Sequence, residues 1–380
     1  MFKKKILLIT ERRADYSRFK PILNLIKKNK KFEYFLVVTG LHLLKSHGRT
    51  INEIISDKFK IYKKIKNFNH FSSDDGEAMV NGIGEVLKKI SPIIKNVKPD
   101  IILTGFDIGA NFALTVAGAH FNIPVAHIQG GEVTGSIDES LRHAMSKFAN
   151  FHFVANNDAK KRLVKMGENK KNIFIVGCPS IDALKIEKEI DERYFMKKFN
   201  LNPNEKFMIA IQHPVTTEQK SSKWQILQTI KAIKSSKIPT IFVMPNNDTG
   251  HKSIIREIKK TSIIWTKNLS LSEYKFLLNR ASILIGNSSS GIHEAASFKL
   301  PVVNIGSRQH GRLRPFNVVD VDYNSNKILK SIKFCLNNNY FRKKIKKLKN
   351  PYGDGNSAKY IINIIEKLNL NLSTQKINTY

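Results

Sequence analysis

The chain has 380 residues, of which 41% are apolar, and its formal net charge at pH 7 is +33. This length exceeds one ordinary α/β core and suits two, and the apolar fraction excludes a disordered chain. The two cysteines, Cys178 and Cys335, form no CxxC pair, which argues against a disulfide scaffold or a thiolate metal site.

The positive charge is spread along the sequence instead of being gathered into a nucleic-acid-binding motif. Lysine clusters occur at 27–31, 58–66, 160–171 and 343–349, without an RNP motif, a zinc finger or a basic stripe with interleaved aromatics. We therefore expect non-specific, salt-dependent binding of polyanions but no specific nucleic-acid partner. No apolar run approaches the roughly 20 residues that span a bilayer, and no signal peptide is recognisable. The sequence thus predicts a cytoplasmic protein without a membrane partner.

Short β-branched runs alternate with longer amphipathic stretches, a pattern typical of βαβ units. In the first half we expect strands at 5–10, 34–39, 101–104, 124–128, 151–154 and 173–176, with helices at 16–30, 78–95 and 110–121. After a polar, mostly helical stretch at 178–205, we expect strands at 207–212, 240–244, 283–286 and 301–305, with helices at 224–235, 271–279, 292–299 and 356–368. Two successive α/β units predict two facing domains with a ligand in the cleft between them.

Polar clusters follow several predicted strands, and in open parallel sheets ligands bind at these carboxyl ends. The first cluster follows the strand at 5–10. In it, Asp15 or Ser17 can cap the free N–H groups of the next helix, and the Arg13 guanidinium offers paired donors to a phosphate. Capping beside a solvated arginine explains this cluster equally well. No GxGxxG motif exists, so dinucleotide binding is not predicted.

The turn after the strand at 283–286 is a better candidate for nucleotide binding. Ser288 and Ser289 line the turn, and Gly291 permits close approach of the backbone. Glu294 lies one turn into the following helix, where a carboxylate can accept both hydroxyls of a ribose.

Further polar residues follow two neighbouring predicted strands. Arg308 and Arg312 come after the strand at 301–305. Helix capping would explain the serines of the turn at 286–291 but not these two arginines, so ligand binding is the better interpretation. His213 follows a strand and precedes Pro214, which fixes the backbone, so we interpret it as functional. We assign His152 to packing or to the surface.

Carboxylates near the predicted strand ends are candidates for proton transfer. Glu132 lies in a glycine-rich loop and has no evident structural task there. Asp107 follows the strand at 101–104 on the same predicted edge of the sheet. Asp138 and Glu139 could instead complement a helix dipole. No HExxH or comparable spacing exists, so no metal is predicted.

Together these clusters resemble the hydrolysing UDP-N-acetylglucosamine 2-epimerase family, from about residue 5 to residue 320. The matching segments, in order, are 13–17, 127–143, 213–217, 245–248, 286–294 and 306–312. The resemblance implies an α/β fold of the glycosyltransferase-B type with two Rossmann-like domains. It implies domains at 1–180 and 181–355, with the helix at 356–380 packing back on the first. It also implies a homo-oligomer (dimer or tetramer) and no cofactor such as NAD.

The motifs and the resemblance together assign three groups of site residues. The catalytic candidates are Asp107, Glu132, Asp138, Glu139 and His213. The residues expected to bind the nucleotide and diphosphate are Arg13, Ser17, Asn247, Asp248, Ser288, Ser289, Gly291, Glu294, Arg308 and Arg312. The residues expected in the sugar pocket are His42, Gln129, Arg142 and His143.

The chain departs from the family pattern at two places. Phe106-Asp107-Ile108 stands where the family usually has Gly-Asp-Arg, and Gln129 stands where the wider family often has glutamate. An amide cannot usefully move a proton, so that role falls on Glu132, Asp107 or Glu139. A less polar pocket would tolerate a deoxy sugar or an additional acetamido group.

The expected function is hydrolysing 2-epimerisation of UDP-N-acetylglucosamine to free N-acetylmannosamine and UDP, through elimination to a glycal and hydration. This reaction would supply sialic acid synthesis. The same reaction on UDP- or GDP-2,4-diacetamido-2,4,6-trideoxyglucose, on a route to legionaminic acid, is an alternative. The motifs are also compatible with a non-hydrolysing epimerase, a glycosyltransferase of the same fold or a non-catalytic nucleotide-sugar sensor, because fold alone cannot choose among them.

Overall fold

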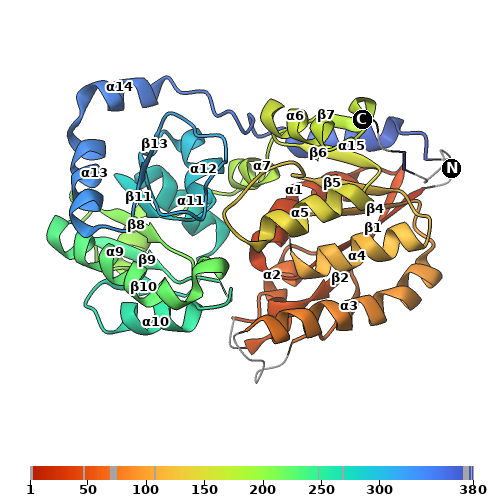
Figure 1. Ribbon diagram of the computed structural model, residues 1–380, viewed down its shortest axis with the longest axis horizontal. Coiled ribbons are helices and arrows are strands. Elements are labelled where there is room, and N and C mark those ends of the chain that lie inside the picture. The colour runs from red at the N-terminus through yellow and green to blue at the C-terminus, as the bar shows by residue number, and fades with distance from the viewer. Residues whose placement is uncertain are drawn as a thin grey trace. The chain divides into compact units, whose positions relative to one another are not determined.

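The chain folds into two compact units, each built around its own parallel sheet (Figure 1). The computed structural model describes residues 3–45, 48–68, 75–106, 108–246, 248–267, 269–370, 376, 377 and 379. Unit 1 consists of Met1–Glu132, Asp138–Ala183 and Tyr352–Tyr380. Unit 2 consists of Val133–Ile137 and Leu184–Pro351, so the chain changes unit at 132/133, 137/138, 183/184 and 351/352.

Unit 1 contains a seven-stranded parallel sheet in the order β3-β2-β1-β4-β5-β6-β7. Its strands are β1 (Lys4–Thr10), β2 (Phe32–Thr39), β3 (Ile61–Ile65), β4 (Ile101–Gly105), β5 (Val125–Ile128), β6 (Phe151–Val154) and β7 (Ile173–Ile175). Its helices are α1 (Arg13–Lys28), α2 (Ile51–Ser56), α3 (Gly76–Val97), α4 (Gly109–His120), α5 (Ile137–Phe148), α6 (Asn157–Lys165), α7 (Pro179–Ile186) and α15 (Ser357–Lys367), with short 3-10 helices η1 (Gly40–Leu43) and η3 (Lys170–Asn172). The first residue of α5 and the last three of α7 belong to unit 2.

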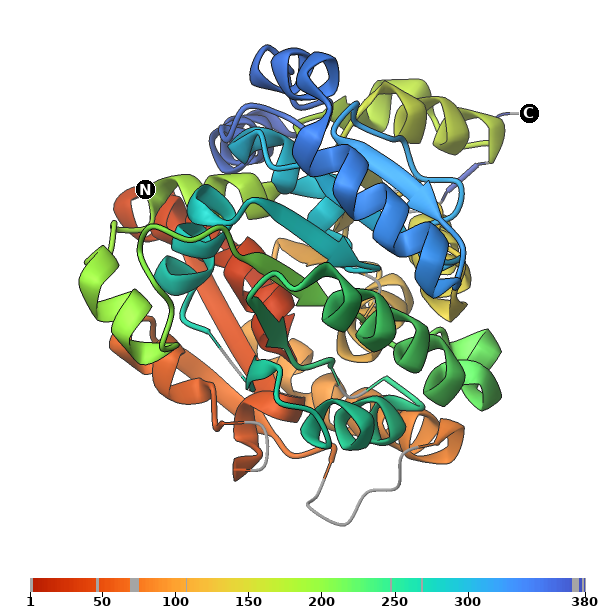
Figure 2. The ribbon, with the colours of Figure 1, turned by 90° about the vertical axis from the view of Figure 1, so that its left-hand side faces the viewer.

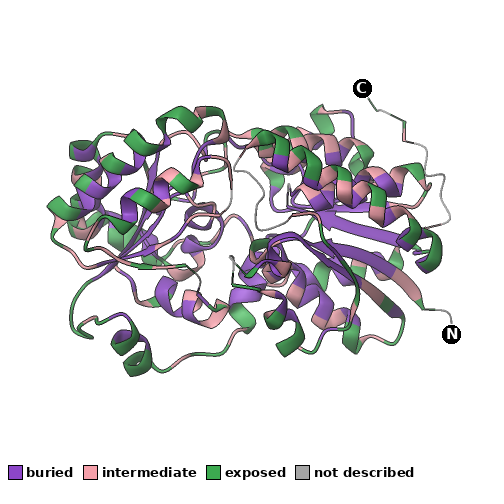
Figure 3. Ribbon diagram, turned by 90° about the horizontal axis from the view of Figure 1, so that it is seen from below, coloured by how far each residue is buried: buried purple, intermediate pink, exposed green. Residues whose placement is uncertain are grey.

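The sheet of unit 1 is buried on both faces, as strand β1 illustrates. Ile6 and Leu8 pack in one apolar cluster with α1 and α15, whereas Leu7 and Ile9 pack in another with α3 and α4. This alternation follows from the two-residue period of a strand. A strand buried on both faces has an unbroken apolar sequence. Figure 3 shows the strands buried and the outer faces of the helices exposed.

Unit 2 contains a six-stranded parallel sheet in the order β10-β9-β8-β11-β12-β13. Its strands are β8 (Met208–Ile211), β9 (Thr240–Val243), β10 (Ile264–Thr266), β11 (Ile283–Gly286), β12 (Val302–Ile305) and β13 (Val318–Val321). Its helices are α8 (Glu192–Lys198), α9 (Ser222–Ser236), α10 (His251–Lys259), α11 (Leu271–Arg280), α12 (Ser290–His293), α13 (Ser325–Asn337) and α14 (Asn339–Lys346), with 3-10 helices η4 (Thr216–Ser221) and η5 (Ala295–Phe298). Helices α9 and α13 lie side by side, as Figures 1 and 2 show.

The predicted α/β class is confirmed, and the predicted strands all occur within a few residues of their expected positions. Strands β3, β10 and β13 escape prediction, and all three are edge strands. Their residues are partly exposed, so they lack the unbroken apolar run of the inner strands. The single helix expected at 292–299 is instead the short helix α12 followed by η5. None of the helices in the described parts of the chain combines the length and apolar character needed to cross a lipid bilayer.

Candidate functional site

The candidate site of unit 1 lies where three neighbouring strands end. Strands β1, β4 and β5 are adjacent and parallel, so the residues that follow them meet at one edge of the sheet. These residues include the predicted clusters after β1 and β5. Asp107, which follows β4, and Asn247, which follows β9 in unit 2, lie outside the described residues.

Two residues of this edge adopt a backbone conformation that favours glycine. Phe106, after β4, has a φ of 71°, and Gln129, after β5, has a φ of 60°. Such conformations cost about 1–3 kcal/mol each in non-glycine residues and cluster at functional sites. Phe106 is held by an edge-on contact with the ring of Phe19, 4.9 Å between centroids. The strain at two neighbouring strand ends therefore favours a functional role for this edge.

The loop after β5 presents Glu132 in a fixed and buried setting. Gln129 and Glu132 are both buried, and Gln129 Nε2 donates to Glu132 Oε1 at 3.2 Å. Arg142, on α5, donates from Nη1 to the carbonyl of Glu132 at 2.8 Å. Gly131 has a φ of 76°, and a Cβ there would lie 2.5 Å from the carbonyl oxygen of Ala159. Gln129 and Arg142 are both predicted for the sugar pocket, and in the structure they hold the loop that carries the carboxylate.

The other predicted carboxylates of unit 1 lie at the start of α5. Asp138 and Glu139 occupy its first turn and are half-buried. His143 Nε2 lies 3.7 Å from Glu139 Oε1, one helical turn away. Burial and the nearby Arg142 guanidinium lower the pKa of His143. This half-buried histidine is therefore mostly neutral at pH 7.

The cluster after β1 is mainly engaged with the protein itself. Asp15 is buried, and its carboxylate accepts hydrogen bonds from the backbone N–H groups of Glu11 and Arg12, each at 2.9 Å. It thus caps α1, whereas Ser17 Oγ donates to the Ala14 carbonyl at 3.0 Å. Arg13 Nε makes an ion pair with Glu53 Oε2 at 2.9 Å. The donors predicted for phosphate therefore already have protein partners.

Glu11 is a buried carboxyl at this edge that sequence reasoning missed. Its Oε2 accepts from the backbone N–H of Ala110 at 2.9 Å, in the first turn of α4, where the helix dipole favours negative charge. Burial raises the pKa of Glu11. An acidic residue directly after a buried strand is the signal that could have revealed it.

His42, predicted for the sugar pocket, lies in η1 between two hydroxyls. Its Nε2 is 3.0 Å from Thr10 Oγ1, and its Nδ1 is 2.7 Å from Thr50 Oγ1. Burial lowers the pKa of His42 to about 3. The side chain is thus a neutral hydrogen-bonding residue over the physiological pH range.

The candidate site of unit 2 centres on His213 and Asn287, after the adjacent strands β8 and β11. The Asn287 side chain accepts from the His213 backbone N–H at 2.7 Å and donates to the His213 carbonyl at 2.9 Å. The imidazole Nδ1 of His213 accepts from the backbone N–H of Asn246 at 3.2 Å. Gly286 has a φ of 121°, and a Cβ there would lie 2.0 Å from the carbonyl oxygen of Ile211. Asn287, absent from the predicted residues, therefore fixes His213.

Both predicted arginines lie in the loop after β12. Arg308 Nη1 and Gln309 Nε2 donate to the Asn287 carbonyl at 3.3 and 2.8 Å. Arg308 Nη2 also lies 3.6 Å from Asp248 Oδ2. Arg312 donates to Gln309 Oε1 at 2.8 Å and to the Val133 carbonyl at 3.1 Å. The structure thus brings Arg308, Asp248 and His213 together around Asn287.

The predicted residues of the turn after β11 have structural tasks. Ser288 and Ser289 are half-buried and precede α12, and Ser288 Oγ accepts from the backbone N–H of Ser290 at 3.3 Å. A Cβ on Gly291 would lie 2.8 Å from Val302 Cγ1, so this glycine lets α12 pack on β12. Glu294 is buried.

The two sets of groups differ in chemistry. Unit 1 presents buried carboxylates suited to proton transfer, and unit 2 presents guanidinium, amide and hydroxyl donors suited to a diphosphate. Within the described residues, no group of three or more histidine, cysteine, aspartate or glutamate side chains could hold a metal ion.

Known proteins with similar sequences identify the family of this chain. A family model described as UDP-N-acetylglucosamine 2-epimerase matches residues 24–366. A hydrolysing UDP-N,N'-diacetylbacillosamine 2-epimerase from Legionella pneumophila is 36% identical over 99% of this chain and the whole of that protein. A UDP-N-acetylglucosamine 2-epimerase from Neisseria meningitidis is 34% identical over 87% of this chain and 86% of its own.

A solved structure shares the fold at lower sequence identity. In this comparison, a solved UDP-N-acetylglucosamine 2-epimerase from Neisseria meningitidis with bound UDP-N-acetylglucosamine has 19% sequence identity and a TM-score of 0.82, and the match covers 96% of this chain and 100% of that one. This likeness extends through both units, as the predicted glycosyltransferase-B-like fold requires. With a family match over most of its length and full-length relatives above 30% identity, the chain belongs to the UDP-N-acetylglucosamine 2-epimerase family.

Proposed function

We propose that the protein is a hydrolysing 2-epimerase that takes UDP-N,N'-diacetylbacillosamine, a UDP-linked 2,4-diacetamido-2,4,6-trideoxyglucose, as its substrate. The observation that carries this proposal is the 36% identity over the full length of a relative named for that reaction. Sequence motifs alone favour UDP-N-acetylglucosamine, and the full-length relative shifts the preference to the diacetamido sugar.

The end of β4 supports the less polar sugar. Phe106 and Ile108 are both buried, and they stand where the family usually has glycine and arginine. A methyl group at C6 and an acetamido group at C4 need fewer polar partners than two hydroxyls. Phe106 has a φ that costs energy in a residue other than glycine, and such strain is found mainly at functional sites, which supports a functional role for its side chain.

The proposed reaction begins with cleavage of the C1–O bond, whose electron pair leaves with UDP. Positive character at C1 acidifies the C2 proton, which Glu132 removes to give the glycal. Arg308 and the backbone amides of Ser288 and Ser289 stabilise the departing diphosphate, as preorganised donors do. His213 is proposed to donate to the same group, and the bonds of its backbone to the Asn287 side chain support a fixed position for it.

Hydration of the glycal completes the reaction. Water adds its hydroxyl at C1, and a second acid protonates C2 from the opposite face, which gives the free manno-configured sugar and UDP. Asp138, Glu139 and Asp107 are the candidates for this acid. The mechanism requires two carboxyl groups in different protonation states, because Glu132 must be ionised to take the C2 proton and the second group must be protonated to donate one.

UDP-N-acetylglucosamine is the second candidate substrate. The Neisseria meningitidis relative that carries this name is 34% identical over 87% of the chain. The two substrates differ at C4 and C6 only, so the same residues would act on C1 and C2.

The test is proton NMR of the purified protein with each UDP-sugar in deuterated water. We expect release of UDP and of a free sugar that carries deuterium at C2, faster from the diacetamido substrate. Faster turnover of UDP-N-acetylglucosamine would reverse the substrate assignment, and turnover of neither would overturn the proposed reaction. Glu132→Gln should lose turnover but bind UDP like the wild type, and an active Glu132→Gln variant would remove Glu132 from the mechanism.

A further inference from the structure

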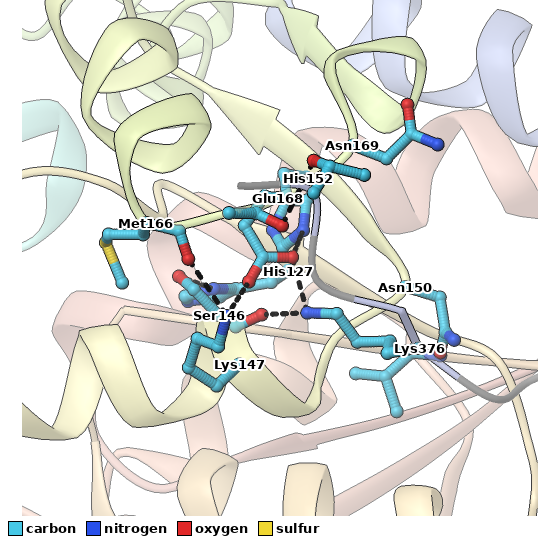
Figure 4. A network of polar contacts seen from close by, with 12 residues as sticks. His127, Ser146, Lys147, Asn150, His152, Met166, Glu168, Asn169 and Lys376 are labelled. Carbon is cyan, nitrogen blue, oxygen red and sulfur yellow. Dashed lines mark hydrogen bonds and ion pairs between the residues drawn. The ribbon is translucent and has the colours of Figure 1, made fainter.

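A buried ion cluster surrounds Glu168, in the loop after α6 (Figure 4). The Glu168 side chain is 1% exposed and accepts a hydrogen bond from His152 Nε2, on β6, at 3.0 Å. Lys147 Nζ, on α5, lies 3.1 Å from Glu168 Oε1. Lys376 Nζ, near the C-terminus, makes an ion pair with Glu168 Oε2. The sequence assignment of His152 to packing or the surface therefore misses its polar role.

Lys376 is the more enclosed of the two cations in this cluster. Its side chain is 22% exposed, against 39% for Lys147. Burial lowers the pKa of Lys376, and the Glu168 carboxylate opposes this effect. Burial also lowers the pKa of His152, so this histidine is neutral at pH 7 and supplies a hydrogen bond without charge. Neutralisation of the enclosed carboxylate thus depends on Lys376 and Lys147.

The cluster continues to the loop that carries Glu132. Lys376 Nζ donates to the carbonyl of Ser146, on α5, at 2.8 Å. Ser146 Oγ donates to the Arg142 carbonyl at 3.0 Å, and His127 Nδ1 lies 3.1 Å from the same hydroxyl oxygen. Because a hydroxyl has a single proton, His127 donates and Ser146 accepts.

The loop rests directly on this histidine and serine. A Cβ on Gly130 would lie 2.8 Å from His127 Nδ1 and 2.9 Å from Ser146 Oγ. One turn earlier on α5, Arg142 holds the Glu132 carbonyl. The same two turns of α5 therefore contact the loop through Arg142 and Ser146, and the cluster through Ser146 and Lys147.

We propose that Lys376 is a positioning residue for Glu132: by joining Glu168 to the Ser146 carbonyl, it fixes the part of α5 on which the loop Gln129–Glu132 rests. This inference rests on the proposed function for its effect on turnover. Its effect on the loop is independent of that function, since the contacts that carry it involve no substrate.

The test compares Lys376→Met with wild type, with Lys376→Arg as the conservative variant and Lys367→Met as the matched control. Lys367 is an exposed lysine at the end of α15. Lys376→Met should lower kcat about tenfold to a hundredfold with a smaller change in KM, because small misplacements of a reacting group have effects of this size. Lys376→Arg should restore most of kcat, and Lys367→Met should match wild type.

Hydrogen exchange of the loop amides provides a readout that needs no turnover. Amides of residues 129–132 should exchange faster in Lys376→Met than in wild type or Lys367→Met. Unchanged exchange together with unchanged kcat would overturn the inference, and so would an equal loss in the Lys367→Met control. If Lys376→Met does not fold, Lys376→Gln keeps a hydrogen-bonding group without the charge and is measured in the same way. A wild type inactive on both sugars would overturn the proposed function and leave the exchange comparison intact.

Discussion

Replacing Glu168 by glutamine should make the stability of unit 1 less dependent on pH. Burial alone raises the pKa of a carboxyl, but the hydrogen bonds from His152 and Lys376 outweigh burial and lower the pKa of Glu168 from 4.5 to about 2. A difference of this size corresponds to about 3 kcal/mol of stability at neutral pH. Because His152 is neutral and contributes no charge, we expect Glu168 to stabilise the folded state at neutral pH by about 2–3 kcal/mol.

The sign follows from the order of the two pKa values. Since the folded pKa of Glu168 lies below the unfolded one, its stabilisation is fully present above about pH 5 and is lost as the pH falls towards 2. The Glu168→Gln variant has no such titration. The difference in free energy of unfolding between wild type and variant should therefore be about 2–3 kcal/mol at pH 7 and about 1–2 kcal/mol smaller at pH 3.

Urea unfolding at pH 7, 5, 4 and 3 measures this difference. The two tryptophans, Trp224 and Trp265, both belong to unit 2, so their fluorescence follows unit 2 while far-ultraviolet circular dichroism follows both units. Glu366→Gln is the control, because that carboxyl is 33% exposed in its ion pair with Lys31 and exposed pairs contribute little. A stability difference that stays constant from pH 7 to pH 3 would refute the electrostatic reasoning.

Three further substitutions test the candidate site, and a fourth, Gly84→Ala, serves as a control. Gln129→Glu would place two carboxylates about 3 Å apart, which corresponds to a repulsion of about 5 kcal/mol at an effective dielectric constant of 20. The acid limb of the pH–rate profile should therefore move to higher pH. An unmoved limb would show that residue 129 does not affect the ionisation of Glu132. Gly286→Ala should lower the melting temperature, because the Cβ of the new alanine would lie 2.0 Å from the Ile211 carbonyl oxygen. In the control Gly84→Ala, on α3, the new Cβ meets no atom within 4 Å, so the free energy of unfolding should rise by about 0.5–1 kcal/mol. Arg308→Ala should weaken UDP binding in calorimetry about tenfold or more, as loss of a charged hydrogen bond does, and unchanged affinity would limit Arg308 to its contacts with Asp248 and Asn287.

The inner strands and the residues directly after them could be predicted from sequence, because both depend on local patterns. Strand β1 is an unbroken apolar run, and the polar residues that follow β5, β8 and β11 stand where open sheets bind ligands. The edge strand β3 could not be predicted in the same way, since three of its five residues are exposed.

The residues that fix the site escaped prediction because their roles depend on distant partners. Glu11 accepts from an amide 99 positions away, and Asn287 holds a histidine 74 positions away. Ser146 receives its bond from Lys376 across 230 positions. No periodicity or short motif records such pairs, so a single sequence indicates the reactive groups and not the residues that orient them.

The division of the chain between the units has a consequence for its synthesis. Unit 2 is complete once residue 351 has been made, but unit 1 still lacks α15 at that point. Ile361, Ile362 and Ile365 of α15 belong to the same apolar cluster as Ile6 and Leu8 of β1. A nascent chain on the ribosome would thus expose part of the core of its first-made unit until α15 has emerged. The usual order of folding from the N-terminus is reversed here, and the middle of the polypeptide is the first part able to reach its native state.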